Sequence, residues 1–377
     1  MVETPRGGPK AVHGGEGLIS SLESYGEKTM MRVRLYRSLW GIRVGPSPAS
    51  PSSPPSSATT SGGQPAFHTR SDLLLALSDL GYAGIEASLS DLGRTRQERS
   101  DFASEIRDAG LGLIVGAYSS WRDYDDDAMD DLHSPLPVQV GRLRDEVLEA
   151  VDLGAVKVNC HSGSDSWTED EALRFFESIE ELRWSGGLGL PSDVGLSHET
   201  HRGRPLGSPW VADRLLSQLP GLRLTSDYSH WVLSCERYFG HRRHGSGIGG
   251  GGECDEGEVG VLRRVADRVD HIHARVGTTQ SPQAGDVRDE RESNPGGLRA
   301  FEDHWKTIRD AVASRGGAEM SVTPEYGPPP YAPPGNPAVD VWDAVEAASA
   351  HAREILESRD ASMAMADSSA AHRRTNE

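Results

Sequence analysis

A short apolar segment at residues 193–204 turns abruptly polar. It reads Asp-Val-Gly-Leu-Ser-His-Glu-Thr-His-Arg-Gly-Arg, and Glu199 stands where the apolar half ends. Side chains alternate faces along a strand, so Ser197, Glu199 and His201 should share one face. A carboxylate at a strand end followed by a polar loop is how (β/α)₈ barrels build active sites. Taken alone, however, such a stretch is more often a capping acid before a loop.

The pattern recurs in three later segments that are predicted as strands. The ligand-type residues at the four strand ends are Glu199, Asp227, His273 and Glu325. Ionised groups converging on a barrel mouth would repel each other and be costly to desolvate, and a divalent cation removes that cost. Three carboxylates and one imidazole form an oxygen-rich set that suits Mn²⁺ or Mg²⁺, with Zn²⁺ or Co²⁺ as alternatives.

The elements that must position these residues alternate regularly along the chain. Helical patterns separate eight segments with strand-like composition, which predicts a parallel sheet with helical crossovers. The fold class expected is α/β, a single (β/α)₈ TIM barrel with disordered N- and C-terminal extensions and flexible loop insertions. The predicted strands are Met31–Gly41, Ala83–Ser88, Leu111–Tyr118, Ala155–His161, Asp193–Glu199, Leu222–Asp227, Val269–Val276 and Met320–Glu325.

Composition sets the expected domain boundaries. The barrel is expected at residues 31–358, between a disordered lead at 1–30 and a disordered tail at 359–377. Two stretches rich in Gly, Pro, Ser or Thr, at 45–66 and 240–257, cannot bury enough apolar surface to offset their ordering entropy, which predicts flexible insertions. The lead lacks the apolar core of a secretory signal, and its acidic residues give a transit peptide little support.

The charge balance limits the class of partner. A formal net charge of −18 opposes a nucleic-acid partner, which normally requires a basic face. The three cysteines show no CxxC spacing, and no apolar run reaches membrane length. We therefore expect a cytoplasmic protein with a small-molecule substrate and no nucleic-acid or membrane partner. Organelle targeting and homo-oligomerisation stay open.

The order of these motifs resembles a known family. They read His-Glu-Thr-His-Arg-Gly-Arg at 198–204, Asp-Tyr-Ser-His-Trp at 227–231, Asp-His-Ile-His at 270–273 and Pro-Glu-Tyr-Gly at 324–327. Together they resemble the xylose isomerase-like TIM-barrel superfamily, in its sugar phosphate isomerase/epimerase branch, over roughly residues 31–357. That branch includes tagatose/psicose 3-epimerases, hydroxypyruvate isomerases and inosose dehydratases.

The resemblance implies an activity and a set of site residues. The activity is that of a divalent-metal-dependent isomerase or epimerase acting on a sugar, or a sugar-derived hydroxy-carbonyl compound, by proton transfer through a metal-stabilised enediolate. Glu199 and Glu325 would be both ligands and proton carriers, and one ion would be held by Glu199, Asp227, His273 and Glu325. The candidates for substrate binding are His161, His201, His230, Arg275 and Trp40.

The sequence also departs from the family's sugar 3-epimerases. Their substrate-binding glutamate, six residues after the first metal glutamate, corresponds to Pro205, and their substrate arginine corresponds to Thr279. Arg275, Arg202 and Arg204 are present instead and suit a phosphate or carboxylate on the substrate. Equally, Arg202 and Arg204 could be loop residues paired to surface acids. The alternatives are an inosose dehydratase-like lyase, an endonuclease IV-like phosphodiesterase and a non-catalytic barrel.

Overall fold

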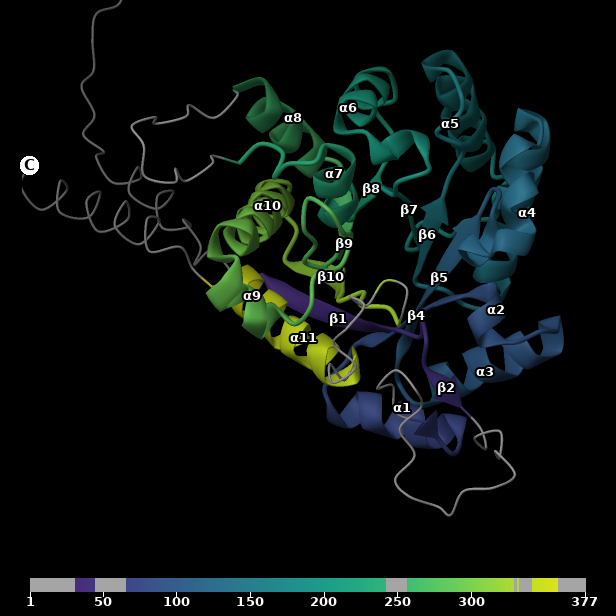
Figure 1. Cartoon of the computed structure of the whole chain (residues 1–377). Coiled ribbons are helices and arrows are strands. Elements are labelled where there is room, and N and C mark those ends of the chain that lie inside the picture. Colours follow the sequence, from purple (N-terminus) through teal and green to yellow (C-terminus); the bar gives the residue numbers. More distant parts are fainter. Residues whose placement is uncertain (1–30, 45–65, 242–255, 329–330, 332–340, 359–377) are drawn as a thin grey trace, which may run out of the picture.

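Eight parallel strands close into a barrel, and helices surround it (Figure 1). The structure, a computed structural model, describes residues 31–44, 66–241, 256–328, 331 and 341–358. The strands pair in the order β1-β10-β9-β8-β7-β6-β5-β4, so the first and second barrel strands in the sequence close the ring. Their bounds are β1 Arg32–Ser38, β4 Gly84–Ser88, β5 Gly112–Tyr118, β6 Lys157–His161, β7 Gly195–Glu199, β8 Leu224–Ser226, β9 Val269–His273 and β10 Glu319–Thr323.

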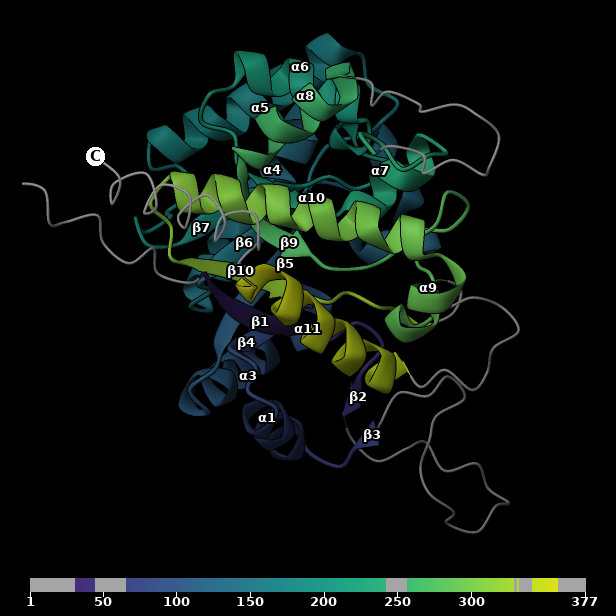
Figure 2. The same ribbon diagram turned by 90° about the vertical axis from the view of Figure 1, so that its left-hand side faces the viewer.

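The outer layer is helical, and α10 and α11 pack side by side on one flank (Figure 2). The helices are α1 Arg70–Asp79, α2 Leu89–Leu92, α3 Arg96–Asp108, α4 Leu136–Asp152, α5 Glu169–Trp184, α6 Pro209–Gln218, α7 Tyr228–Ser234, α8 Glu256–Ala266, α9 Val287–Ser293, α10 Pro295–Ser314 and α11 Val341–Glu357. The 3₁₀ turns are η1 Arg122–Tyr124, η2 Asp126–His133 and η3 Pro205–Gly207, and a small sheet joins β2 Arg43–Val44 to β3 Ala66–Phe67. Among the described helices, none is long and apolar enough to cross a membrane.

Capping residues fix where the barrel helices begin. The side chain of Thr168 accepts a hydrogen bond from the amide of Glu171, whose carboxylate accepts from the Thr168 amide in return. Thr69 and Thr95 start α1 and α3 in the same reciprocal way. Each box satisfies two amides that the first helical turn leaves without partners.

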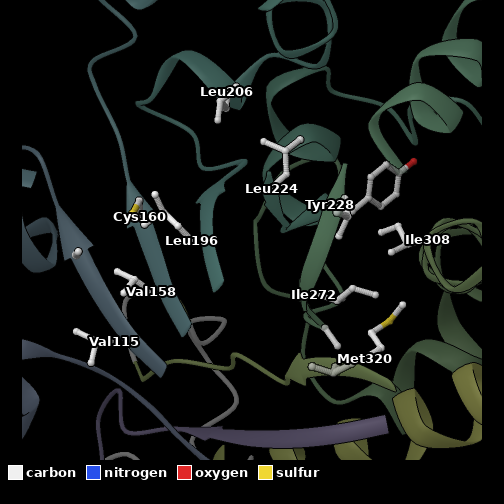
Figure 3. Packing of buried hydrophobic residues seen from close by; sticks show 14 of the residues in the cluster. Val115, Val158, Cys160, Leu196, Leu206, Leu224, Tyr228, Ile272, Ile308 and Met320 are labelled. Atoms are coloured by element: carbon white, nitrogen blue, oxygen red, sulfur yellow. The ribbon is translucent and has the colours of Figure 1, made fainter. Parts of the chain in front are cut away.

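Alternation along each strand separates an apolar layer from a polar interior. On β6, Val158 and Cys160 belong to the buried cluster between sheet and helices, whereas Asn159 and His161 take part in the polar contacts inside the barrel. Figure 3 shows the same layer at Ile272 of β9, which lies beside Ile308 of α10. The outward layer stabilises the fold and leaves the inward positions free for polar side chains.

The predicted fold class is confirmed, and the eight strands lie within one to three residues of their expected bounds. Strand β10 ends at Thr323, so Glu325 lies in the following loop. The predicted insertions were drawn too wide, because Ala66 begins β3 and α8 begins at Glu256. The remaining residues of those insertions lie outside the described ranges, except Gly240 and His241, as do the predicted lead and tail.

Two glycines test the packing of the barrel wall. A Cβ on Gly84 would lie 2.1 Å from the Gly112 carbonyl oxygen, whereas a Cβ on Gly141, within α4, meets no atom within 4 Å. Gly84→Ala should therefore lower the free energy of unfolding by ~1–3 kcal/mol. Gly141→Ala should raise it by ~0.5–1 kcal/mol, because alanine restricts the unfolded chain and favours the helix. Urea unfolding measures both, and equal effects would contradict the close approach of β4 and β5.

A buried histidine predicts how stability depends on pH. Burial lowers the pKa of His304 to about 3, and its Nε2 lies 2.9 Å from Ser226 Oγ. The unfolded chain binds a proton near pH 6.5, so this contribution to stability is complete above pH 6.5 and is lost as the pH falls towards 3. Between pH 6 and 4, His304→Gln should flatten the slope of unfolding free energy by ~1.4 kcal/mol per pH unit. Parallel slopes for the two proteins would contradict a neutral, buried imidazole.

Candidate metal centre

The four predicted ligands converge at the carboxyl ends of their strands. Glu199 ends β7, Asp227 follows β8, His273 ends β9 and Glu325 follows β10. Each offers one ligand-type atom, and these atoms all lie within 4.8 Å of one another. His273 Nδ1 lies 3.6 Å from Glu199 Oε1 and 3.4 Å from Glu325 Oε2. The first three side chains are buried, and Glu325 is 19% exposed.

Two buried atoms in this cluster lack a hydrogen-bond partner. They are Glu199 Oε1 and His273 Nδ1, the same pair that lies 3.6 Å apart. Buried polar atoms are nearly always hydrogen-bonded, so two facing buried atoms without partners need a physical reason. A divalent ion between them would satisfy both atoms, and the carboxylate-rich set suits a hard cation. The residues present therefore fit a metal ion.

Arg275 contributes a positive charge inside the cluster. Its Nη2 lies 2.5 Å from Asp227 Oδ2, and its Nη1 lies 3.2 Å from Glu325 Oε2. The other oxygen of Asp227 accepts hydrogen bonds from the amide and hydroxyl of Ser229 at the start of α7. Asp227 is therefore held from both sides, and the guanidinium offsets part of the charge that an ion would otherwise balance.

The pKa shifts express the same excess of negative charge. Burial raises the pKa of Asp227 to about 6, although Arg275 opposes the shift. Burial would also raise the pKa of Glu199, but the neighbouring histidines, His161 foremost, hold it well below its usual range. Burial would lower the pKa of His273, and the carboxylates of Glu325 and others outweigh that effect and raise it. Nearby charges of the opposite sign therefore stabilise the buried charges of this cluster, and hydrogen bonds from Ser229 add to this at Asp227.

The five residues predicted to bind substrate gather at the same end of the barrel. His161 Nδ1 lies 3.3 Å from Glu199 Oε2. His230 Nε2 lies 3.0 Å from Arg275 Nη2, and the centres of the His201 and His230 rings are 3.8 Å apart. Trp40 follows β1 and touches Tyr331 edge-on at 4.8 Å, and the Arg275 guanidinium lies 5.3 Å from that tyrosine ring. Binding of substrate by these residues stays a prediction.

An aromatic wall that the sequence analysis missed lines this end. Tyr118 stacks on His161 at 4.2 Å, and Tyr124 stacks on His201 at 4.2 Å. The Tyr124 hydroxyl lies 2.8 Å from His161 Nδ1. The backbone of Tyr124 is left-handed, with φ of 55°. Non-glycine residues rarely adopt this conformation, and those that do are found often at functional sites. An aromatic pair, Trp121 and Tyr124, in the loop after a barrel strand was the available signal.

Two of the arginines left open by the sequence have separate roles. Arg204 is buried and donates to the carbonyl oxygens of Gly163 and Ser120, so its hydrogen bonds hold loops together. Arg202 is half-buried and donates to the Tyr331 hydroxyl at 3.2 Å. Both arginines also contact tyrosines at the mouth, since the Arg204 guanidinium lies 5.3 Å from the Tyr124 ring and the Arg202 guanidinium 5.3 Å from the Tyr331 ring.

A separate hollow of about 600 Å³ lies outside the barrel, beside α3 and α4. Its lining mixes arginines with carboxylates, and Arg99 and Arg122 bond to Glu149 and Glu146. These two ion pairs neutralise part of the charge that lines it. The barrel mouth, with its unpaired atoms, is the better candidate for chemistry.

No family model matches this chain, and no curated protein matches it. Solved structures do. A D-psicose 3-epimerase with D-fructose matches with a TM-score of 0.49 at 12% identity, over 87% of this chain and 100% of its own. The chain resembles xylose isomerase-like TIM barrels. One such protein from Mycobacterium smegmatis, in complex with magnesium, matches with a TM-score of 0.44 at 15% identity, over 84% of this chain and 97% of its own.

Endonuclease IV from Thermus thermophilus also matches, with a TM-score of 0.44 at 13% identity, over 87% of this chain and 99% of its own. The chemistry has to be argued from the residues at the barrel mouth.

Arg275 gives a direct test of the charge balance. Arg275→Gln should lower the free energy of unfolding of metal-free protein by ~3–5 kcal/mol, because it leaves Asp227 buried without its cation. Mn²⁺ at 100 times its Kd should then restore ~2.7 kcal/mol. Arg204→Gln is the matched control, since that buried arginine bonds mainly to loop groups. Thermal or urea unfolding at one fixed Mn²⁺ concentration measures both. Arg275→Gln should gain more stability from that concentration than Arg204→Gln, because loss of the guanidinium beside Asp227 strengthens ion binding, and equal gains would contradict the assignment.

Proposed function

We propose that this protein is a divalent-metal-dependent isomerase or epimerase that acts on a sugar or a sugar-derived hydroxy-carbonyl compound. The observation that supports the proposal is the set Glu199, Asp227, His273 and Glu325, which converges at the carboxyl end of the barrel with two unpaired atoms facing each other. This end is where barrel enzymes place their active sites. The proposed ion is Mn²⁺ or Mg²⁺, with Zn²⁺ or Co²⁺ as alternatives.

Two carboxylates supply the proton transfer in this proposal. Glu199 Oε1 and Glu325 Oε2 lie 3.6 Å and 3.4 Å from His273 Nδ1, so both carboxylates border the space proposed for the ion and the substrate. One removes a carbon-bound proton, and the other returns a proton to the resulting enediolate. A divalent ion would polarise the substrate carbonyl and stabilise the negative charge that develops. Asp227 and His273 serve as ligands only.

The remaining residues orient the substrate and exclude water. His161, His230 and Arg275 present their ring nitrogens and guanidinium to the same space as the four ligands. The stacked rings of Tyr118 and Tyr124 provide an apolar surface beside it, of the kind that covers the face of a sugar ring. Charges in a site closed by such a wall interact more strongly than in water.

A lyase is the second candidate, and one contact favours it. The Tyr124 hydroxyl and His161 Nδ1 lie 2.8 Å apart beside Glu199. Such a pair could donate a proton to a β-hydroxyl of the substrate, which would leave as water while the enediolate electrons form the new carbon–carbon double bond. The isomerase returns its proton to carbon instead, so the first step is common to both reactions.

Metal stoichiometry separates these enzymes from an endonuclease IV-like phosphodiesterase. About one ion per chain supports the isomerase or lyase, and about three ions support the phosphodiesterase. In one further cluster of candidate ligands, Glu86, His271 and His273, both nitrogens of His271 already have partners, Ser321 and Glu86. That engagement argues against an ion at Glu86, His271 and His273. A third cluster among the described residues, Glu199, His201 and His230, has a buried and unpaired His230 Nδ1, so the measured stoichiometry has to decide whether it holds an ion.

Deuterium exchange tests the proposal directly. The protein with Mn²⁺ in D₂O would be screened against ketoses, inososes, hydroxypyruvate and their phosphates. Uptake of deuterium at a carbon next to a carbonyl supports the proposal, and loss of water from the same substrate identifies the lyase. No uptake into any of these compounds, together with no product, would contradict the enzyme assignment and favour a non-catalytic barrel.

The two glutamates should differ from Asp227 in how their variants respond to metal. Glu199→Gln and Glu325→Gln keep an oxygen ligand but lose the basic carboxylate. At saturating Mn²⁺, turnover should therefore stay ~10²–10⁴-fold below wild type. Asp227→Asn should act mainly through metal affinity, so excess Mn²⁺ should restore much of its activity. Steady-state kinetics on the substrate found in the screen measures these effects.

Asp227→Asn is also the control for general damage to the site, since it makes the same carboxylate-to-amide change at a neighbouring ligand. Full recovery of both glutamate variants in excess metal would show that they are ligands only and that the proton carriers lie elsewhere.

A further inference from the structure

Glu86 is a buried carboxylate inside the barrel that the proposed reaction does not use. It lies on β4, two strands in sequence before β6, and its neighbours come from three other strands. His273 Nε2 and Asn159 Nδ2 lie 3.0 Å and 3.3 Å from its Oε1. His271 Nε2 lies 3.1 Å from its Oε2, and the Thr323 hydroxyl donates to the same oxygen. Glu86 is thus an acceptor at the centre of a hydrogen-bond network.

The network decides which nitrogen of His273 is free. Nε2 faces Glu86, whereas Nδ1 has no hydrogen-bond partner and faces Glu199 and Glu325. A carboxylate only accepts hydrogen bonds, so Nε2 must carry the hydrogen in this contact. The lone pair of a neutral His273 ring is then on Nδ1, which points into the cluster of predicted ligands. Carboxylates that hold a metal-binding histidine in this way also restrict its rotation.

The same network orients Glu199. Asn159 Nδ2 lies 3.1 Å from Glu199 Oε2 and 3.3 Å from Glu86 Oε1, so one amide group joins the two carboxylates. His161 Nδ1 also approaches Oε2, at 3.3 Å. These contacts engage Oε2 and leave Oε1 without a partner, facing His273 Nδ1. Both unpaired atoms of the cluster therefore owe their positions to groups bonded to Glu86.

We propose that Glu86 is a positioning residue that holds His273 with Nδ1 towards the metal site and, through Asn159, turns Glu199 Oε1 to the same point. The inference rests on the metal site of the proposed function. Glu86 touches neither the ion nor the substrate in this role. It acts on affinity by reducing the number of orientations that the two ligands must give up on binding.

A second metal site at Glu86, His271 and His273 is the competing explanation. His271 Nδ1 lies 2.8 Å from Ser321 Oγ, and its Nε2 already faces Glu86. Binding an ion there would break the bonds that Glu86 makes to His271 and His273. The geometry points to a hydrogen-bond network rather than to a ligand set, and stoichiometry distinguishes the two.

The test uses the full chain with Mn²⁺ alone as the probe. Glu86→Gln keeps an oxygen acceptor and nearly the same volume, and Glu86→Leu removes every acceptor. Calorimetric titration should give a Kd for Mn²⁺ ~10-fold weaker for Glu86→Gln and ~100-fold weaker for Glu86→Leu, the range found when outer partners of metal ligands are lost. Glu258→Gln is the matched control, because Glu258 is a similarly buried carboxylate on α8 that bonds to Arg237 and Gly240.

A spectroscopic measurement separates positioning from a general loss of structure. In ¹⁵N-histidine-labelled protein loaded with Zn²⁺, His273 should show a metal-shifted Nδ1 and a protonated Nε2. The proton on Nε2 should move upfield in Glu86→Gln, because a neutral amide accepts a weaker hydrogen bond than a carboxylate. His273→Gln assigns the signals. Glu258→Gln should leave both the Kd and these signals as in wild type.

Three results would overturn the inference. An unchanged Kd in both Glu86 variants would remove the positioning role while leaving the metal site intact. Binding of two ions by wild type and one by Glu86→Gln would make Glu86 a ligand of a second ion. Failure of wild type to bind Mn²⁺ at all would remove the metal site of the proposed function and this inference together.

Discussion

The need to balance several carboxylates in a space closed to water governs this structure. Glu86, Glu199 and Asp227 are buried, and Glu325 is largely so, within one end of a barrel. An isolated buried charge costs several kcal/mol, and two like charges side by side cost more. The barrel meets this constraint with a guanidinium, with imidazoles and with a geometry that leaves a place for a cation. The polar contacts across the interior follow from it.

Arg275 shows how the balance is divided. Its guanidinium reaches Asp227 and Glu325, whereas the free oxygen of Glu199 and the free nitrogen of His273 face each other without a partner. The cluster therefore has one half that the chain neutralises itself and one half that it leaves open. A site built this way can stay folded without an ion and still bind one, because only part of the charge depends on it.

The polar network and the apolar layer depend on each other. The alternation along β6 places Cys160 against the helices and Asn159 inside the barrel. The packing that holds the strand therefore also directs the side-chain amide of Asn159 towards Glu199. Tyr118 stacks on the His161 ring, and the Tyr124 hydroxyl lies beside His161 Nδ1. Among the predicted ligands, Glu199 and His273 end strands, and Asp227 and Glu325 lie within two residues of strand ends. Barrel folds commonly place functional residues at the ends of strands and in the loops that follow them.

The sequence by itself determined the architecture and which residues meet. Strand and helix periods of two and 3.6 residues are local properties, so eight strands and their order could be read without coordinates. The parallel closure then brings all strand ends to one edge, which is why Glu199, Asp227 and His273 could be predicted to converge. Glu325 lies two residues beyond the end of β10 and still joins the cluster, because a loop residue next to a strand end stays at the same end of the barrel.

Only the tertiary structure decided which atom of each residue is free. His273 Nε2 bonds to Glu86, whereas His273 Nδ1 has no hydrogen-bond partner and faces Glu199 and Glu325. These neighbours come from parts of the chain that are far apart in the sequence. Arg204 and Arg275 look alike in the sequence, yet one bonds to loop carbonyls and the other to Asp227. Tyr124 reaches the site because Trp121, Asp123 and Tyr124 have a left-handed backbone, which the local sequence does not predict. Hydrogen-bond partners and loop paths depend on distances across the whole barrel. The local periodicity of the sequence therefore cannot predict them.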